Sequence, residues 1–123
     1  MSSIRRYKIN SGAIDASGNA IAYSAPITGR ILAVMIDYPA HACTVDLDTD
    51  GPISQKILDL SSASTDRVVY PRVQVHDYQG NGVTYDGTNE IYEPFVVAGR
   101  VKLTVAGGTA NESVSVYLVV EEH

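Results

Sequence analysis

The last quarter of the chain alternates apolar and polar residues over two long stretches, and this alternation limits what the chain can fold into. Val101, Leu103 and Val105 alternate with polar residues, and apolar residues occupy every second position from 114 to 120. A period of two is that of a β-strand with one buried face. The small, glycine-containing segment 106–112 between the stretches predicts a β-hairpin. Two such strands are not stable alone in water, so the rest of the chain must supply a facing sheet.

Shorter stretches of the same kind, separated by turn residues, fill the rest of the chain. No ten consecutive residues carry a convincing helical period. Proline cannot donate to a β-ladder, so Pro71 marks an edge or a bulge in the last of the shorter strands. Residues 1–123 are therefore expected to form one all-β domain, an antiparallel β-sandwich or a jelly-roll-like barrel. The expected strands before residue 90 are 4–10, 20–24, 29–38, 43–47, 54–60 and 67–77.

The most apolar stretch is 29–38, which contains a run of consecutive apolar residues from 31 to 36. In a regular strand, the apolar side chains of this run would alternate between the two faces. A strand that is apolar on both faces is central in a sandwich or is covered by another subunit. We expect a second copy of the chain to cover the face that carries Val34, because the sequence offers no amphipathic helix for this purpose.

A five-residue pattern occurs twice, as ITGRI at 27–31 and as VAGRV at 97–101. Each copy begins a long strand that is expected to continue into a hairpin return, with 43–47 as the return of the first. The two hairpins are thus predicted to play equivalent parts, as the inner strands of the two sheets.

The charge is unevenly distributed along the chain. The net charge is −5, but Arg5, Arg6 and Lys8 give the first eight residues +3 and leave −8 on the rest. Most of such a surface repels phosphate, so nucleic acid is not an expected partner. This short basic N-terminal arm, about residues 1–8, is expected to contact an acidic surface on a neighbouring subunit or a larger assembly. The alternative is an ordinary solvated end strand.

No membrane or export signal is visible in the sequence. The run 31–36 is far too short to span a bilayer, and no apolar segment follows the charged first residues. The single cysteine rules out an internal disulfide. We therefore expect a chain that is made in the cytoplasm and does not bind a membrane.

The sharpest chemical motif is DLDTDG at 46–51. Asp46, Asp48 and Asp50 could converge on a calcium ion, as alternate acidic residues do in a calcium loop. The twelfth position of such a loop should be a bidentate glutamate, and here it is Ile57. We expect an exposed acidic strand that ends in an Asp-Gly turn, with no tight metal site.

No catalytic constellation is recognisable. His41 and Cys43 lie close together, but two soft ligands are only half of a zinc site. No serine stands in a nucleophile elbow that His76 could serve, and the glycine pairs do not match a phosphate loop. We therefore expect neither an enzyme nor a cofactor.

Tyrosine dominates the aromatic residues, with eight tyrosines against one phenylalanine and no tryptophan. Tyr70, Tyr78, Tyr85 and Tyr92 lie close together between proline and glycine residues. Tyrosine joins a large apolar body to a polar tip, so this cluster is a candidate interface or a sugar-stacking surface. Tyrosines at the margins of a sheet would give the same pattern.

The second half of the sequence resembles a known class of proteins. The segments that carry the likeness are YPRVQVHD at 70–77 and GVTYDGT at 82–88, with the strand 97–105 behind them. They resemble small structural proteins from the head-gene cluster of tailed bacteriophages, which are usually described as head decoration or cement proteins. The likeness covers about residues 67–120, and the first half agrees only in its pattern of strands and turns.

The resemblance implies a β-sandwich on the outside of a capsid, often as a trimer at a symmetry axis, with the major capsid protein as partner. It transfers no site residues. A decoration protein would bind the assembled shell better than its separated subunits and would stabilise the shell by mass action. The alternative function is a carbohydrate- or receptor-binding β-module on a virion or cell surface.

Overall fold

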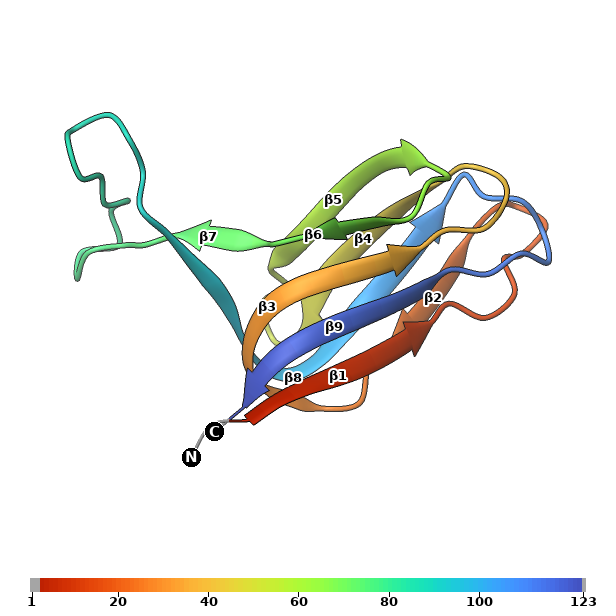
Figure 1. Cartoon of the computed structure of the whole chain (residues 1–123), viewed down its shortest axis with the longest axis horizontal. Helices are drawn as coiled ribbons and strands as arrows, with labels where there is room; N and C mark the ends of the chain where they lie inside the picture. The colour runs from red at the N-terminus through yellow and green to blue at the C-terminus, as the bar shows by residue number, and fades with distance from the viewer. Residues whose placement is uncertain (1–2, 123) are drawn as a thin grey trace.

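The computed structural model describes residues 3–122, which form nine β-strands and no helix (Figure 1). All paired strands are antiparallel. The prediction of an all-β fold is confirmed. The strands are β1 (Ser3–Asn10), β2 (Ala20–Tyr23), β3 (Ile27–Asp37), β4 (Cys43–Asp50), β5 (Lys56–Ala63), β6 (Arg67–Val69), β7 (Arg72–Gln74), β8 (Tyr92–Ala106) and β9 (Ser115–Glu122).

The strands form one continuous sheet, ordered β1-β9-β3-β8-β4-β5, that folds over into two layers (Figure 1). β1, β9, β3 and β6 make up the front sheet, whereas β2, β4, β5 and the second half of β8 make up the back sheet. β8 joins the layers because its first half pairs with β3 and its second half pairs with β2 and β4. The architecture is a sandwich-like fold.

The core lies between the two sheets and is filled from alternate positions of the long strands. Val101, Leu103 and Val105 of β8 and Val116 and Leu118 of β9 are all fully buried. The alternation read from the sequence thus identifies the buried face of both strands. Removing these branched side chains from water supplies the main driving force for the sandwich.

The predicted hairpins are wrong, although their strands are right. β8 pairs with β2, β3, β4 and β7, whereas β9 pairs with β1 and β3 in the other layer. β4 likewise pairs with β5 and β8 and is no return strand for β3. The loop after β8 crosses between the layers and is held by backbone hydrogen bonds, from Gly108 N to Gly18 O at 3.0 Å and from Asn111 N to Ile14 O at 2.9 Å. Two strands that are each apolar on one face bury these faces equally well in opposite sheets of a sandwich and as neighbours in one sheet.

The two copies of the repeated pattern lie side by side at the junction of the layers. Thr28 pairs with Ala98, and Gly29 pairs with Val97. The first copy begins β3 at Ile27, as predicted, but the second copy lies inside β8, which begins at Tyr92. The prediction that both strands are inner strands is confirmed, since β3 and β8 lie inside the strand order. The arginines of the two copies also play matching parts, because Arg30 pairs with Glu121 of β9 and Arg100 pairs with Asp50 of β4.

The expected exposure of Val34 is also wrong. The pairing of β3 with β9 shifts register between Ile31 and Ala33, which marks a β-bulge. The extra residue changes the facing of the strand, so that Ile31 and Val34 both point into the core with 0% exposure. Val34 therefore cannot contact a second copy, and the outward side of β3 carries Ala33 and Met35, which are half-buried.

A projecting hairpin, residues 72–94, extends away from the sandwich (Figure 1). β7 and the start of β8 form its base, in agreement with the break predicted at Pro71. Its tip, residues 75–91, is built on a ring of backbone hydrogen bonds that joins Val75, Val83 and Ile91. The amides of these residues donate to the carbonyl oxygens of Ile91, Val75 and Val83 at 2.8, 2.7 and 3.2 Å, respectively.

Candidate interaction surfaces

The outer face of the front sheet follows from the register of its strands. Lys8 of β1 lies opposite Tyr117 of β9, Tyr117 lies opposite Met35 of β3, and Met35 lies opposite Val68 of β6. These four side chains therefore form one row across the outside of the sheet.

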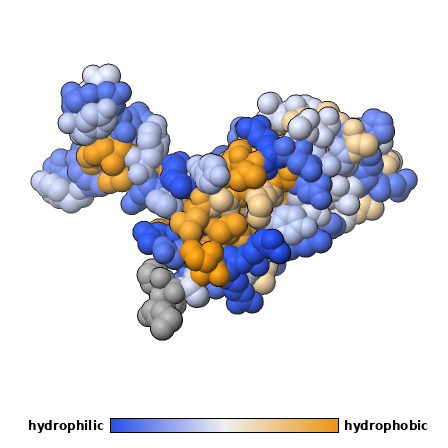
Figure 2. All heavy atoms as spheres, in the orientation of Figure 1, coloured by the Kyte–Doolittle hydropathy of each residue, from blue (hydrophilic) through white to orange (hydrophobic). Residues whose placement is uncertain are grey.

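Apolar side chains gather on this outer face. Figure 2 shows them as a continuous patch over the middle of the front sheet, separate from a second apolar patch on the projecting hairpin. A sheet face that points to solvent ordinarily carries polar residues, so this patch needs a cover or a partner. The apolar residues at its exposed or half-buried positions are Ile4, Ala33, Met35, Val68, Val96 and Val119.

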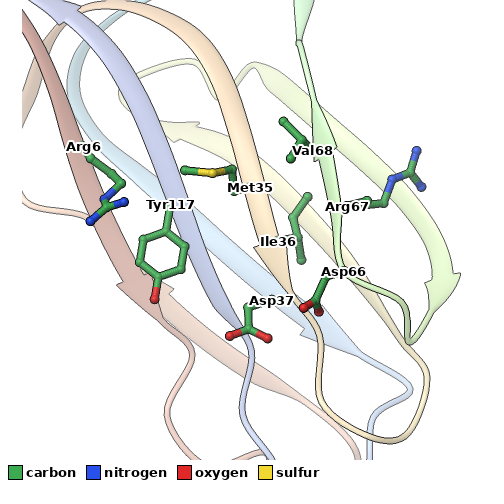
Figure 3. Close-up of a pocket in the computed structure, with 8 residues that line it drawn as sticks. All are labelled: Arg6, Met35, Ile36, Asp37, Asp66, Arg67, Val68 and Tyr117. Carbon is green, nitrogen blue, oxygen red and sulfur yellow. The ribbon is translucent and has the colours of Figure 1, made fainter.

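A shallow groove of about 440 Å³ lies along the row through Met35. Met35 is in its middle in Figure 3, with the other lining side chains around it. An open groove with an apolar floor and charged borders is suited to a side chain from another molecule. The residues around Met35 are Arg6 and Tyr117 on the β1 side, Arg67 and Val68 on the β6 side, and Asp37 and Asp66 at one end.

The basic N-terminal cluster is divided by the pleat of β1. Arg6 and Lys8 lie over the ring of Tyr117 on the outer face, at 5.5 and 5.7 Å from the ring centre. Arg5 lies over the ring of Tyr7 instead, at 4.9 Å. Residues 3–8 are hydrogen-bonded to β9, so this part of the arm is an edge strand, and Met1 and Ser2 lie outside the described residues. Only Arg6 and Lys8 of the three border the apolar patch.

The outer face of the back sheet is polar and charged. One row runs from Tyr23 of β2 through Lys102 of β8 and Asp48 of β4 to Lys56 of β5. Opposite charges alternate along most of this row, as in a self-neutralising ladder. The charges of this row are thus largely balanced by oppositely charged side chains of the same chain.

The three aspartates of the candidate calcium motif are engaged by basic side chains. Lys56 Nζ lies 3.3 Å from Asp48 and 3.8 Å from Asp46, and Arg100 lies 2.6 Å from Asp50. Among residues 3–122, no group of three or more histidine, cysteine, aspartate or glutamate side chains is placed to hold a metal ion. Asp50 is directed to a different strand from the other two, so the alternation in sequence does not bring the carboxylates to one point.

Burial raises the pKa of Asp46, and the neighbouring carboxyl group of Asp59 raises it further, while Lys56 opposes both effects. Asp46 and Asp59 lie directly opposite each other on β4 and β5. Like charges at such a pair destabilise the ladder, so the repulsion between Asp46 and Asp59 lowers the stability of the back sheet.

The four tyrosines singled out in the sequence are all exposed, and all lie on or beside the projecting hairpin. Tyr78 is 95% exposed and Tyr85 is 71% exposed, both in the tip. Tyr70 precedes the hairpin, and the hydroxyl of Tyr92 at its base donates to Glu90. Solvent-exposed tyrosines at a projecting tip are available to a partner. Tyrosines at the margins of a sheet, the alternative interpretation of the cluster, would be less accessible.

Two aspartates shape the loops that carry these tyrosines. The Asp77 carboxylate accepts hydrogen bonds from the amides of Gln79 and Asn81 at 2.9 and 3.0 Å. Asp86 makes the same kind of turn with the amides of Thr88 and Asn89. The backbone hydrogen bonds, led by those of Asn81 and Asn89, lower the pKa of Asp77 and of Asp86, so both remain ionised at neutral pH.

A second hollow, of about 750 Å³, lies in the angle between the projecting hairpin and β5. Its lining mixes Lys56 and Glu93 with Gln74 and His76. These side chains include no nucleophile paired with a base, so the hollow offers no catalytic arrangement.

Comparisons of the chain with protein-family models, with curated proteins and with solved structures gave no match. No helix long and apolar enough to cross a membrane occurs within residues 3–122. The surfaces themselves are therefore the basis for a functional proposal.

Reasoning from sequence missed the groove and its central residue. Met35, Val68 and Tyr117, which line the groove, lie far apart in the chain, and only strand pairing brings them together. The signal that points to them is the run 31–36, which has more apolar residues than one buried face needs. The sequence pattern alone places Val34 on the outer face, where the structure has Met35. The tyrosine cluster, by contrast, is visible in the sequence, and the structure shows that its four members are exposed.

Proposed function

We propose that this protein decorates the outside of a bacteriophage head, binding the major capsid protein and stabilising the shell by contact and not by catalysis. The observation that carries the proposal is the one-sided distribution of exposed apolar residues. Most of them gather on the front sheet and on the projecting hairpin, with Ile21, Tyr23 and Ile53 as exceptions, while the aspartates of the back face pair with basic side chains of the same chain.

A protein of this kind needs a rigid body and an adhesive side, and the sandwich supplies both. Exposed tyrosine and apolar side chains next to Arg6 and Lys8 have the composition of a protein interface. The resemblance of residues 67–120 to decoration proteins supports the same proposal. The projecting hairpin falls entirely within that segment.

The test uses heads of the bacteriophage whose genome carries this sequence, stripped of the protein. Purified protein should sediment with the heads, and the temperature at which the heads break should rise with its concentration, because it binds the intact shell preferentially. Separated capsid subunits are the control and should bind less. Protein that stays in the supernatant at all concentrations, with heads of unchanged stability, would overturn the proposal.

The second candidate function is carbohydrate or receptor binding through the projecting hairpin. The full exposure of Tyr78 favours it, since an aromatic ring that stands free in solvent can stack on a sugar. A glycan array separates the two functions. Retention of a defined glycan that is lost in Tyr78→Ala, without binding to heads, would favour this candidate.

A further inference from the structure

Most of the exposed apolar side chains of the described residues lie in two regions, and these regions lie apart. One is the front sheet with its groove, and the other is the projecting hairpin with its tip, residues 75–91 (Figure 2). The groove lies at the carboxyl end of β3, whereas the hairpin projects from the opposite end of the sandwich (Figure 1). The tip therefore points away from the groove of its own chain.

The tip is acidic. Residues 75–91 contain Asp77, Asp86 and Glu90 and no lysine or arginine. Arg72, at the base of the hairpin, is held by the body, because its guanidinium donates to the carbonyl oxygen of Leu32 at 3.2 Å. The charge offered by the tip is thus negative, and each of its exposed tyrosines has an aspartate as its immediate neighbour in sequence.

The long border of the groove is basic. Arg6 lines its β1 side and Arg67 lines its β6 side. Lys8 lies just beyond the lining, over the same Tyr117 ring as Arg6. The carboxylates of Asp37 and Asp66 are confined to one end, and Asp66 accepts a hydrogen bond from the amide of Tyr38 at 2.8 Å. An acidic partner is attracted to the long side and repelled from that end, which fixes its direction in the groove.

We propose that the tip of the projecting hairpin of one copy docks in the front-sheet groove of a second copy. Tyr78 or Tyr85 is the anchor that fills the groove over Met35, since an aromatic ring gains from contact with a thioether and with neighbouring cations. The neighbouring aspartates then face Arg6 and Lys8.

This contact joins different surfaces of the two copies. It leaves one tip and one groove free in every pair, so further copies add, as a closed ring if the rotation between neighbours permits and as an open chain if it does not. Docking of this kind deepens the proposed function and rests on it, because a decoration protein that self-associates through its tip binds the shell as a multivalent unit.

Two variants block the two halves of the contact separately. The groove variant is Met35→Asp, and the tip variant is Tyr78→Ala with Tyr85→Ala. Matched controls are Ile21→Asp, at an exposed position of the back sheet, and Tyr70→Ala, which precedes the hairpin. Circular dichroism and thermal unfolding show which variants keep the fold, and Arg6→Glu with Lys8→Glu replaces the groove variant if Met35→Asp does not fold.

Sedimentation velocity is then measured over a range of concentrations. Wild type and both controls should associate, while each half-variant alone should associate more weakly by on the order of tenfold or more. An equimolar mixture of the two half-variants should form a one-to-one complex that does not grow, since it contains one intact tip and one intact groove. High salt should weaken every association.

The outcomes separate this inference from the proposed function. A wild type that stays monomeric at all concentrations, or half-variants that do not complement each other, overturns docking of the tip in the groove. A tip variant that associates like wild type overturns it too and indicates face-to-face packing of two front sheets. Binding to heads is measured independently, so a monomer that still binds heads leaves the proposed function standing, and an oligomer that binds no heads overturns only that function.

Discussion

The outer faces of the front and back sheets have the same backbone geometry and different chemistry. On the back face, Lys56 and Arg100 neutralise the aspartates of β4 within the chain. On the front face, the central row passes through Met35 and Val68, with charge only at its borders. A face whose polar groups are satisfied internally gains little from a partner, whereas an apolar face releases water when it is covered. The difference indicates which side of the sandwich works by contact.

The largest effect on stability should come from placing a charge on the buried face of the front sheet instead of on its outer face. Val34 is fully buried and its neighbour Met35 points outward. Val34→Asp should destabilise the fold by about 4 kcal/mol or more, because the carboxylate enters the core without a partner. Met35→Asp should cost within about 1 kcal/mol, as surface substitutions do. Urea unfolding of both variants measures the difference, and equal losses would show that β3 is buried on both sides.

A smaller effect is expected on the back face from the loss of an ion pair. Arg100→Ala removes the pair with Asp50 and the stacking of the guanidinium on Tyr23, whose ring centre is 4.3 Å away. The loss should be about 0.5–1 kcal/mol, because the pair is largely exposed to solvent. Chemical unfolding at low and high salt measures it. Arg100→Lys is the control that keeps the charge, and a loss insensitive to salt would contradict the electrostatic origin.

At Asp46, by contrast, a substitution should increase the stability of the fold at neutral pH. Its raised pKa means that the folded state favours the protonated form, so its contribution to stability is present below the ordinary pKa of 3.8 and is lost as the pH rises through the raised pKa. Asp46→Asn should therefore stabilise the protein at neutral pH by less than about 1 kcal/mol and have no such benefit in acid. The trend is measured by unfolding midpoints over about pH 3 to 7, a range that spans this titration. Equal destabilisation at every pH would show that the pair with Lys56 outweighs the repulsion by Asp59.

The smallest effect on global stability concerns the tip that we propose as ligand of the front face. The lowered pKa values of Asp77 and Asp86 mean that their contribution is present above 3.8 and is lost as the pH falls through the lowered values. Acid should loosen the tip while the sandwich stays folded. Amide hydrogen exchange of Gln79, Asn81 and Asn89 should quicken before that of β8. Simultaneous loosening of tip and sandwich would contradict independent unfolding of the hairpin.

The sequence predicted more about the hairpin than about the groove. Pro71 and the surrounding glycines and tyrosines are local signals, and they correctly placed a break in the strand and a tyrosine-bearing segment there. The groove is lined by residues of β1, β3, β6 and β9, and these residues are as far apart in the chain as Arg6 and Tyr117. No local pattern encodes that neighbourhood. The bulge after Ile31 was also beyond prediction, because a one-residue shift leaves the composition unchanged and reverses the facing of every later side chain.

The sequence by itself determined the all-β class, the period of each long strand and most of the buried residues of β8 and β9, because alternation is a property of neighbouring residues. Only the tertiary structure decided which strands pair. Backbone hydrogen bonds between strands are the same for any side chains, so the layers are chosen by how all the apolar faces close one core together. That choice separated β8 from β9, brought the two repeated patterns into one ladder, and placed Met35 and not Val34 on the outside of the front sheet.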